Sequence, residues 1–267
     1  MKRKGGKTKP EPCLKRYINN ILNLIIMCFH NSLSKKVSAL ASRYGRKSDI
    51  VEIYQDILNE QYHVNAFNFP LYPIITDSDE IQAYRWGLIP FWAKSEKSAE
   101  ELRKMTLNAR GDTLFQKPSF REPIRSKRCL IPSTGYFEWR HEGNKKIPYY
   151  IYVKDSPVFS IAGIYDTWLN KSTGEVQNTF SLITTDANAL TDYIHNTKHR
   201  MPAILSKENE KIWLESGLSP TDISTLLKPM DADRMDAYVI ENNFIRKLPT
   251  DPSILRRADS SPSMLPE

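Results

Sequence analysis

Five short stretches of this 267-residue chain hold residues whose side chains can do chemistry. They are Met27-Cys28, Trp86–Trp92, Leu107–Asp112, Pro132–Trp139 and Ile194–Pro202. A cysteine supplies a nucleophile, and a glutamate or histidine carries protons to or from a reacting group. Taken one at a time, most of these residues have a structural explanation, because a lone cysteine or tryptophan is usually packed in a core.

For Glu138, a structural role and a catalytic role explain the residue type equally well. It lies between Phe137 and Trp139 in a run that alternates like a strand. A glutamate among large aromatic residues either faces water or is buried for a purpose, since burying an unpaired carboxylate is costly.

Metal and cofactor chemistry finds little support in the sequence. His195 and His199 have the four-residue spacing of a zinc-binding helix, but no glutamate lies between them and Pro202 follows closely. The glycine patterns that bind phosphates or dinucleotides are absent, and so is the Ser nucleophile elbow. We therefore expect no metal and no cofactor.

In order and in combination, the stretches resemble the SOS-response-associated peptidase (SRAP) family. The resemblance rests on Met-Cys, Trp-Gly-Leu-Ile-Pro-x-Trp, Asn-Ala-Arg, Arg-Cys-Leu-Ile-Pro-x-x-Gly-Tyr-x-Glu-Trp, Ile-His and Arg-Met-Pro. It covers residues 27–227. Members of that family are abasic-site processing proteins that crosslink to damaged DNA, and they expose the cysteine as the first residue of the mature protein.

The resemblance implies a mechanism in which Cys28 becomes the N-terminal residue by autocatalytic cleavage. Its α-amine, with an ordinary pKa of about 7.7–8.0, attacks the aldehyde of a ring-opened abasic sugar in single-stranded DNA, and its thiol closes a thiazolidine ring. The family pattern assigns Asn108 to orienting the cysteine or to hydrogen-bonding the opened sugar, and Glu138 to proton transfer. A histidine near Arg-Met-Pro assists. Relatives commonly read His-x-Arg-Met-Pro, whereas Lys198 stands at that spacing here. We therefore assign His195, with His199 as the alternative.

Two other functions remain open at this stage. One is a cysteine peptidase acting on other proteins, with Cys28 as nucleophile and a histidine as base. The other is a non-catalytic module that binds single-stranded DNA.

Charge is unevenly distributed along the chain. The net charge is +7, but residues 1–26 hold seven basic residues against Glu11 alone, so the remaining 241 residues are nearly neutral. Basic residues gather again between residues 103 and 128, where eight oppose two acidic ones. The candidate DNA contacts are Arg110, Arg125 and Arg200 for phosphates, and Trp86 and Trp92 for unstacked bases.

Residues 1–26 are expected to be missing from the functional chain, either removed as a leader or lying upstream of a natural start at Met27. Their basic beginning and apolar end are how a secretory signal starts. However, asparagines interrupt the apolar run, no small-x-small cleavage site follows, and the run is shorter than the about 20 residues that span a bilayer. With only three cysteines as well, we expect a cytoplasmic monomer that binds no membrane and joins the nucleoid at damaged DNA.

The elements that must position these residues follow from apolar periodicity. The predicted strands are Ala83–Leu88, Cys129–Pro132, Tyr136–Arg140, Tyr149–Val153, Val158–Tyr165, Thr179–Thr184 and Ala237–Ile240. The predicted helices are Ser48–Leu58, Glu96–Lys104, Asp186–Ile194, Lys207–Leu214 and Pro220–Leu227. A first helix is expected to start at Ser32 or Ser34 as N-cap and to end at Gly45.

The composition, 40% hydrophobic and 26% charged, is typical of a globular protein. We predict a single α+β domain over residues 27–248, with a β-rich core formed by a barrel-like antiparallel sheet and with peripheral helices. Residues 249–267 are expected to form a flexible tail.

Overall fold

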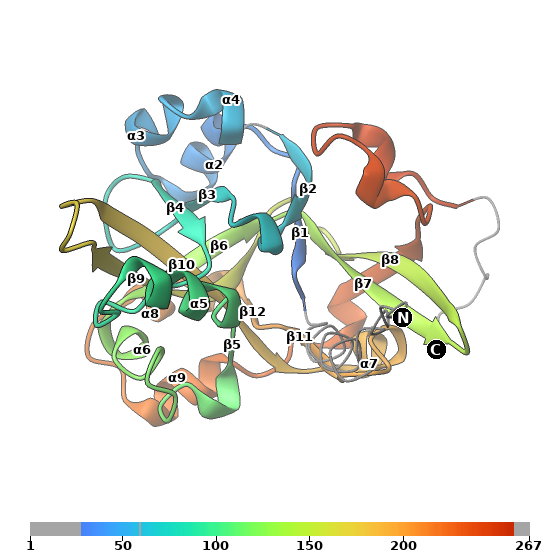
Figure 1. The fold of residues 1–267 in the computed structure, drawn as a ribbon. Coiled ribbons are helices and arrows are strands. Elements are labelled where there is room, and N and C mark those ends of the chain that lie inside the picture. Colours follow the sequence, from blue (N-terminus) through green and yellow to red (C-terminus); the bar gives the residue numbers. More distant parts are fainter. Residues whose placement is uncertain (1–27, 59, 259–267) are drawn as a thin grey trace, which may run out of the picture.

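Strands pair into two sheets in the computed structural model, which describes residues 28–58 and 60–258 (Figure 1). The five-stranded sheet has the order β13-β8-β7-β1-β2, and all its neighbours run antiparallel. Its strands are β1 (His30–Leu33), β2 (Gln61–Asn65), β7 (Gly135–Glu142), β8 (Lys145–Val153) and β13 (Met235–Val239). This sheet positions two of the five stretches, because β1 begins two residues after Cys28 and β7 contains Glu138.

The eight-stranded sheet is built around a long hairpin of β9 and β10. Its strands are β3 (Leu71–Ile74), β4 (Gln82–Trp86), β5 (Asn108–Arg110), β6 (Arg128–Ser133), β9 (Phe159–Leu169), β10 (Val176–Asp186), β11 (Arg200–Pro202) and β12 (Ile204–Leu205). Both β4 and β5 run parallel to β10, whereas the other pairs are antiparallel. This sheet therefore carries the Asn-Ala-Arg and Arg-Met-Pro motifs on strands that both pair with β10.

Helices lie around the sheets (Figure 1). The α-helices are α2 (Val37–Tyr44), α3 (Asp49–Glu52), α4 (Gln55–Leu58), α5 (Glu96–Met105), α6 (Pro123–Ser126), α7 (Ala189–Ile194), α8 (Lys207–Leu214) and α9 (Pro220–Leu226). The short 3-10 helices are η1 (Ala66–Asn68), η2 (Gly111–Thr113), η3 (Ala232–Arg234), η4 (Phe244–Arg246) and η5 (Pro252–Leu255). Ser95, Asn188, Ser206 and Ser219 cap the four later predicted helices with their side chains. None of the helices in the described ranges has the length and apolar character needed to cross a membrane.

The prediction of a strand-rich α+β domain is confirmed, but the barrel-like core is not, because the described sheets do not close into a barrel. Beyond the end of β3, only Ile75 pairs with Leu130 of β6, through two reciprocal backbone hydrogen bonds. One residue pair is a bridge and not a ladder, so this contact does not make β3 and β6 neighbouring strands of a closed barrel.

The predicted N-cap of the first helix is wrong. Ser32 lies in β1, where its backbone pairs with Gly135 of β7. Helix α2 begins only after Lys36, which makes no side-chain capping bond, and it ends as expected at Gly45 with φ +61°. Strand β1 has only four residues, which is too few for an alternation of apolar and polar residues to be recognised in the sequence.

The segment predicted as one helix from Ser48 to Leu58 forms two helices of four residues each, α3 and α4. Two of its apolar residues face solvent, because Ile53 is 79% exposed and Ile57 is exposed too. Val51 and Leu58 point into the core instead. These two positions are seven residues apart, which also fits a helical period.

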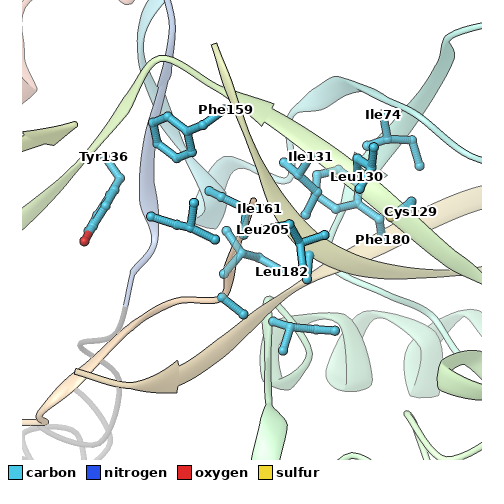
Figure 2. Close-up of a cluster of buried hydrophobic side chains, with 14 of the residues drawn as sticks. Ile74, Cys129, Leu130, Ile131, Tyr136, Phe159, Ile161, Phe180, Leu182 and Leu205 are labelled. Carbon is cyan, nitrogen blue, oxygen red and sulfur yellow. The ribbon is translucent and has the colours of Figure 1, made fainter. Parts of the chain in front are cut away.

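The main core lies where β6, β9 and β10 meet, as Figure 2 shows for Leu130, Ile131, Ile161, Phe180 and Leu182. Their side chains are all buried, so the central hairpin is fixed by apolar packing on its neighbours.

The beginning of the expected flexible tail is folded in the described residues. Residues 252–255 form η5, and Ile254 is buried in a small aromatic cluster with Phe137 and Phe244. Residues 259–267 lie outside the described range, so the expectation for that part stays a prediction.

Candidate active site

Cys28 lies two residues before the start of β1 and is buried. Its φ of +29° is unusual for a residue with a side chain, and such conformations are held by their surroundings and cluster at functional sites. Its backbone N–H donates a hydrogen bond of 2.7 Å to Oε1 of Glu138. The nitrogen that would become the α-amine is therefore in direct contact with a carboxylate.

Glu138 is buried on one face of β7 because side chains alternate along a strand. Phe137 and Trp139, its neighbours in sequence, contact Phe244 on the opposite face with ring centroids 4.8 and 5.7 Å away. The aromatic flanks thus anchor the strand from behind. Of the two explanations for Glu138, the structure therefore excludes the water-facing one and buries the carboxylate.

His195 follows the last turn of α7 and is also buried. Its Nδ1 lies 2.9 Å from the backbone carbonyl oxygen of Arg200. A carbonyl only accepts, so Nδ1 carries a proton, and Nε2 is the acceptor when the ring carries no second proton. That Nε2 lies 3.7 Å from Oε2 of Glu138 and has no hydrogen-bond partner among the described residues.

His199, the alternative, lies elsewhere. Its side chain is 58% exposed and its Nδ1 is 2.6 Å from Asp192. Of the two histidines, only His195 is brought next to Glu138.

Asn108 reaches the site from the other sheet. It begins β5 and pairs with Leu182 of β10. Its Nδ2 donates to the backbone oxygen of Cys28 at 3.4 Å. The four predicted catalytic residues, Cys28, Asn108, Glu138 and His195, therefore converge where the two sheets meet.

The surroundings of Cys28 keep its thiol protonated. Burial raises the pKa of this thiol well above its ordinary value, and the nearby Glu138 carboxylate raises it further. The Arg200 guanidinium opposes this effect more weakly. The sulfur is consequently a thiol at neutral pH and needs a base before it can act as a nucleophile.

Tyr136 is a residue that sequence analysis missed. It shares the face of β7 with Glu138, and burial raises the pKa of its hydroxyl well above the ordinary value, with a further contribution from Glu138. Figure 2 shows that hydroxyl turned away from the labelled apolar side chains. Tyr136 Oη is buried without a hydrogen-bond partner in the described part of the chain. The sequence did contain a signal for this residue, because Tyr136 lies two positions before Glu138 in a predicted strand and therefore shares its face.

Two of the residues predicted to contact DNA have buried side chains. Trp86 is fully buried and donates its indole N–H to the Leu107 carbonyl at 2.8 Å. Arg200, with a side chain 6% exposed, donates to Asp186 and to the Thr184 carbonyl. Their contacts with DNA therefore stay predictions.

The other predicted contacts are exposed. Arg125 is exposed, and Arg110 pairs with Asp112 at 2.5 Å on the surface. Trp92 is 39% exposed, and its neighbour Phe91, which sequence analysis missed, is 56% exposed. Trp86 and Trp92 are the same residue type, and they differ as candidates for base stacking only because the tertiary structure buries Trp86.

One further property of the site concerns metals. The donor atoms of Cys28, Glu138 and His195 all lie within 4.8 Å of one another, and all three residues are buried. The same residues can thus act as a nucleophile with an acid–base partner, or as three ligands of one ion.

Comparisons with known proteins identify the family. The chain is 41% identical over 209 residues to the abasic site processing protein YoqW of Bacillus subtilis, covering 74% of this chain and 90% of that one. It is 35% identical over 179 residues to the abasic site processing protein HMCES of Gallus gallus, covering 58% and 52%. A crystal structure of a protein from Bacteroides thetaiotaomicron, 69% identical, superimposes with a TM-score of 0.86 over 86% of this chain and 100% of that one. Residues 27–246 match the SOS response associated peptidase (SRAP) family, and the chain belongs to that family.

Proposed function

We propose that this protein processes abasic sites in DNA by forming a covalent bond between Cys28, as its N-terminal residue, and the ring-opened sugar. The observation that carries the proposal is the 2.7 Å contact between Cys28 N and Glu138 Oε1. It pairs the future amine with a buried proton carrier. The abasic site processing relatives supply the substrate class.

Exposure of the amine requires hydrolysis of the peptide bond between Met27 and Cys28. Water adds to the carbonyl of residue 27, the C–N bond breaks, and the leaving nitrogen takes up a proton to become the α-amine. Glu138, whose Oε1 accepts a hydrogen bond from that nitrogen, takes the proton released by the attacking water and passes it to the leaving nitrogen. The positive φ of Cys28 adds local strain that cleavage would release.

Crosslinking then proceeds in two bond-forming steps. The neutral amine attacks C1′ of the aldehyde, and the resulting carbinolamine loses one water to give a Schiff base. The thiol next adds to the same carbon, its proton passes to the nitrogen, and a five-membered thiazolidine ring closes. Glu138 accepts the proton lost by the amine and returns it to the departing hydroxyl.

The remaining residues have supporting roles. Asn108, through Nδ2, holds the backbone of Cys28 against the second sheet. His195, 3.7 Å from Glu138, exchanges protons with it and assists reversal of the crosslink. The raised pKa of the thiol fits an order in which the amine reacts first. It argues against a cysteine peptidase acting on other proteins, since such an enzyme needs a thiolate.

Recognition of DNA is assigned to the exposed candidates. Arg110 and Arg125 contact phosphates, and Phe91 and Trp92 stack on bases that are already unpaired. Phosphate contacts carry no sequence information, so binding depends on the lesion and on single-strandedness.

The test uses protein whose N-terminus at Cys28 is established by intact mass. It is incubated with a single-stranded oligonucleotide carrying one abasic site, and covalent product is quantified on a denaturing gel. We expect an adduct from the wild type and from Cys129→Ala, the matched control at the second buried cysteine. An undiminished adduct from Cys28→Ala would contradict the proposal.

A further inference from the structure

We propose that Cys28, Glu138 and His195 also form a binding site for Zn²⁺ or a similar thiophilic divalent ion, and that the bound ion reversibly masks the reactive cysteine. The masking rests on the proposed function, whereas the metal site itself does not.

The donor set is the first argument. A thiolate, a carboxylate and an imidazole are the three ligand types that zinc takes in proteins. Here their donor atoms lie within 4.8 Å of one another, so modest side-chain movements bring all three to one ion. All three residues are buried, which distinguishes them from the exposed acidic clusters that are common on protein surfaces.

The hydrogen bonding of His195 is the second, independent argument. Its Nδ1–H donates to the Arg200 carbonyl, leaving the Nε2 lone pair directed at Glu138 without a hydrogen-bond partner among the described residues. Metal-binding histidines almost always donate their other N–H to a carbonyl or carboxylate in this way, which fixes the tautomer and the ring orientation. His199 lacks this arrangement, because it is exposed and paired with Asp192.

Charge and chelation complete the argument. Binding displaces the thiol proton to solvent, so one thiolate and one carboxylate neutralise the divalent ion in a buried place where an unbalanced charge would be costly. In the processed chain the α-amine of Cys28 is a fourth donor. Together with the sulfur it closes a five-membered chelate ring, and the amine nitrogen already lies beside Glu138.

The consequence follows from the same atoms. An ion held by both the amine and the thiol of Cys28 removes the two groups that form the thiazolidine. The bound ion therefore keeps the cysteine unreactive, and a chelator or a competing ligand restores it.

The experiment measures binding before activity. Processed protein is titrated with Co²⁺, whose thiolate charge-transfer and tetrahedral d–d absorption bands report the ligands, and with Zn²⁺ by calorimetry. We expect one ion per chain, and no thiolate band in Cys28→Ala. Glu138→Gln and His195→Ala should weaken binding by at least the roughly 10–100-fold that loss of an outer-shell partner costs. His199→Ala should bind like the wild type. Circular dichroism and intact mass confirm the fold and the N-terminus of each variant.

Outcomes separate this site from the proposed function. Absence of a thiolate band in wild-type protein, or an unchanged band in Cys28→Ala, would overturn the metal site while leaving adduct formation as a separate result. Stoichiometric binding that does not slow the adduct would overturn the masking. Stoichiometric binding with the expected variant pattern supports the site even if no adduct ever forms, and suppression of the adduct that chelation reverses supports the masking.

Discussion

The two faces of β7 each bury a cluster that contains histidine, and the clusters differ in how their polar atoms are satisfied. On one face, Glu138 meets Cys28 and His195, and both His195 Nε2 and Tyr136 Oη lack partners in the described ranges. On the other, Phe137 and Trp139 enclose a pair of stacked histidines.

That pair, His30 and His63, is satisfied internally. Their rings stack with centroids 5.1 Å apart, and Nδ1 of His30 lies 2.8 Å from Nε2 of His63, so one nitrogen donates and the other accepts. Satisfied polar atoms in an apolar cluster stabilise a fold, whereas buried atoms without partners mark a place that awaits a ligand or a reaction. The comparison predicts activity effects on one face and stability effects on the other.

The largest effect is expected for Glu138→Gln. Losing the proton carrier should slow adduct formation by about 10²–10⁴-fold, the usual contribution of general acid–base catalysis. The measurement is the initial rate of adduct formation on denaturing gels. Glu142→Gln is the matched control, since Glu142 is exposed at the end of the same strand and pairs with Arg140. Equal rates for both variants would remove Glu138 from the mechanism.

The histidine pair should make stability depend on pH. Burial lowers the pKa of His30 to about 3, with a further contribution from His63, and lowers the pKa of His63 to about 4. The unfolded chain therefore binds more protons than the folded chain below pH 6.5, and stability falls as pH decreases toward 4. At about 1.4 kcal/mol per pKa unit, the interval between pH 6.5 and pH 4 costs roughly 3 kcal/mol for each histidine, or about 6 kcal/mol for the pair.

Urea unfolding between pH 7 and 4 measures this loss. A His63→Gln variant should be less stable at pH 7 but should show a flatter pH profile than the wild type. An unchanged slope in that variant would contradict the assignment of the pH dependence to this pair.

Loss of the exposed aromatic residues should weaken DNA binding and leave the chemistry intact. Replacing Trp92 by Ala should cost about 1–3 kcal/mol of affinity for single-stranded DNA, the value of one stacked base. Phe91→Ala should cost less or the same. Fluorescence anisotropy with undamaged oligonucleotides gives the affinity, and the adduct rate at saturating DNA should stay within a few-fold. A normal affinity in the double variant would place the stacking surface elsewhere.

The smallest effect is expected for Tyr136→Phe. Removing a buried hydroxyl that has no partner in the described residues should raise stability by about 1 kcal/mol. If that hydroxyl binds the opened sugar, the adduct rate should fall at the same time. A variant that is less stable and equally active would show that the hydroxyl belongs with the structural face.

The sequence predicts the residues of the candidate site better than it predicts which neighbouring side chains are buried. The alternation around Glu138 predicts a strand, and the resemblance to the SRAP family implies that Asn108 and His195 share a site with Cys28. Sequence cannot show that Trp86 and Arg200 are buried, since burial depends on strands that pair with β10 from distant parts of the chain. Nor does it reveal the His30–His63 pair, because β1 is too short to show alternation and β2 brings His63 from 33 residues away.

The central claim is that Cys28 reacts through both its amine and its sulfur. Proteolytic digestion of the purified adduct, followed by mass spectrometry, identifies the modified peptide directly. The account predicts a peptide that begins at Cys28, carries the sugar remnant, and resists alkylation of its thiol. A modified peptide that still contains Met27, or a remnant attached to a lysine with an alkylatable Cys28, would contradict it.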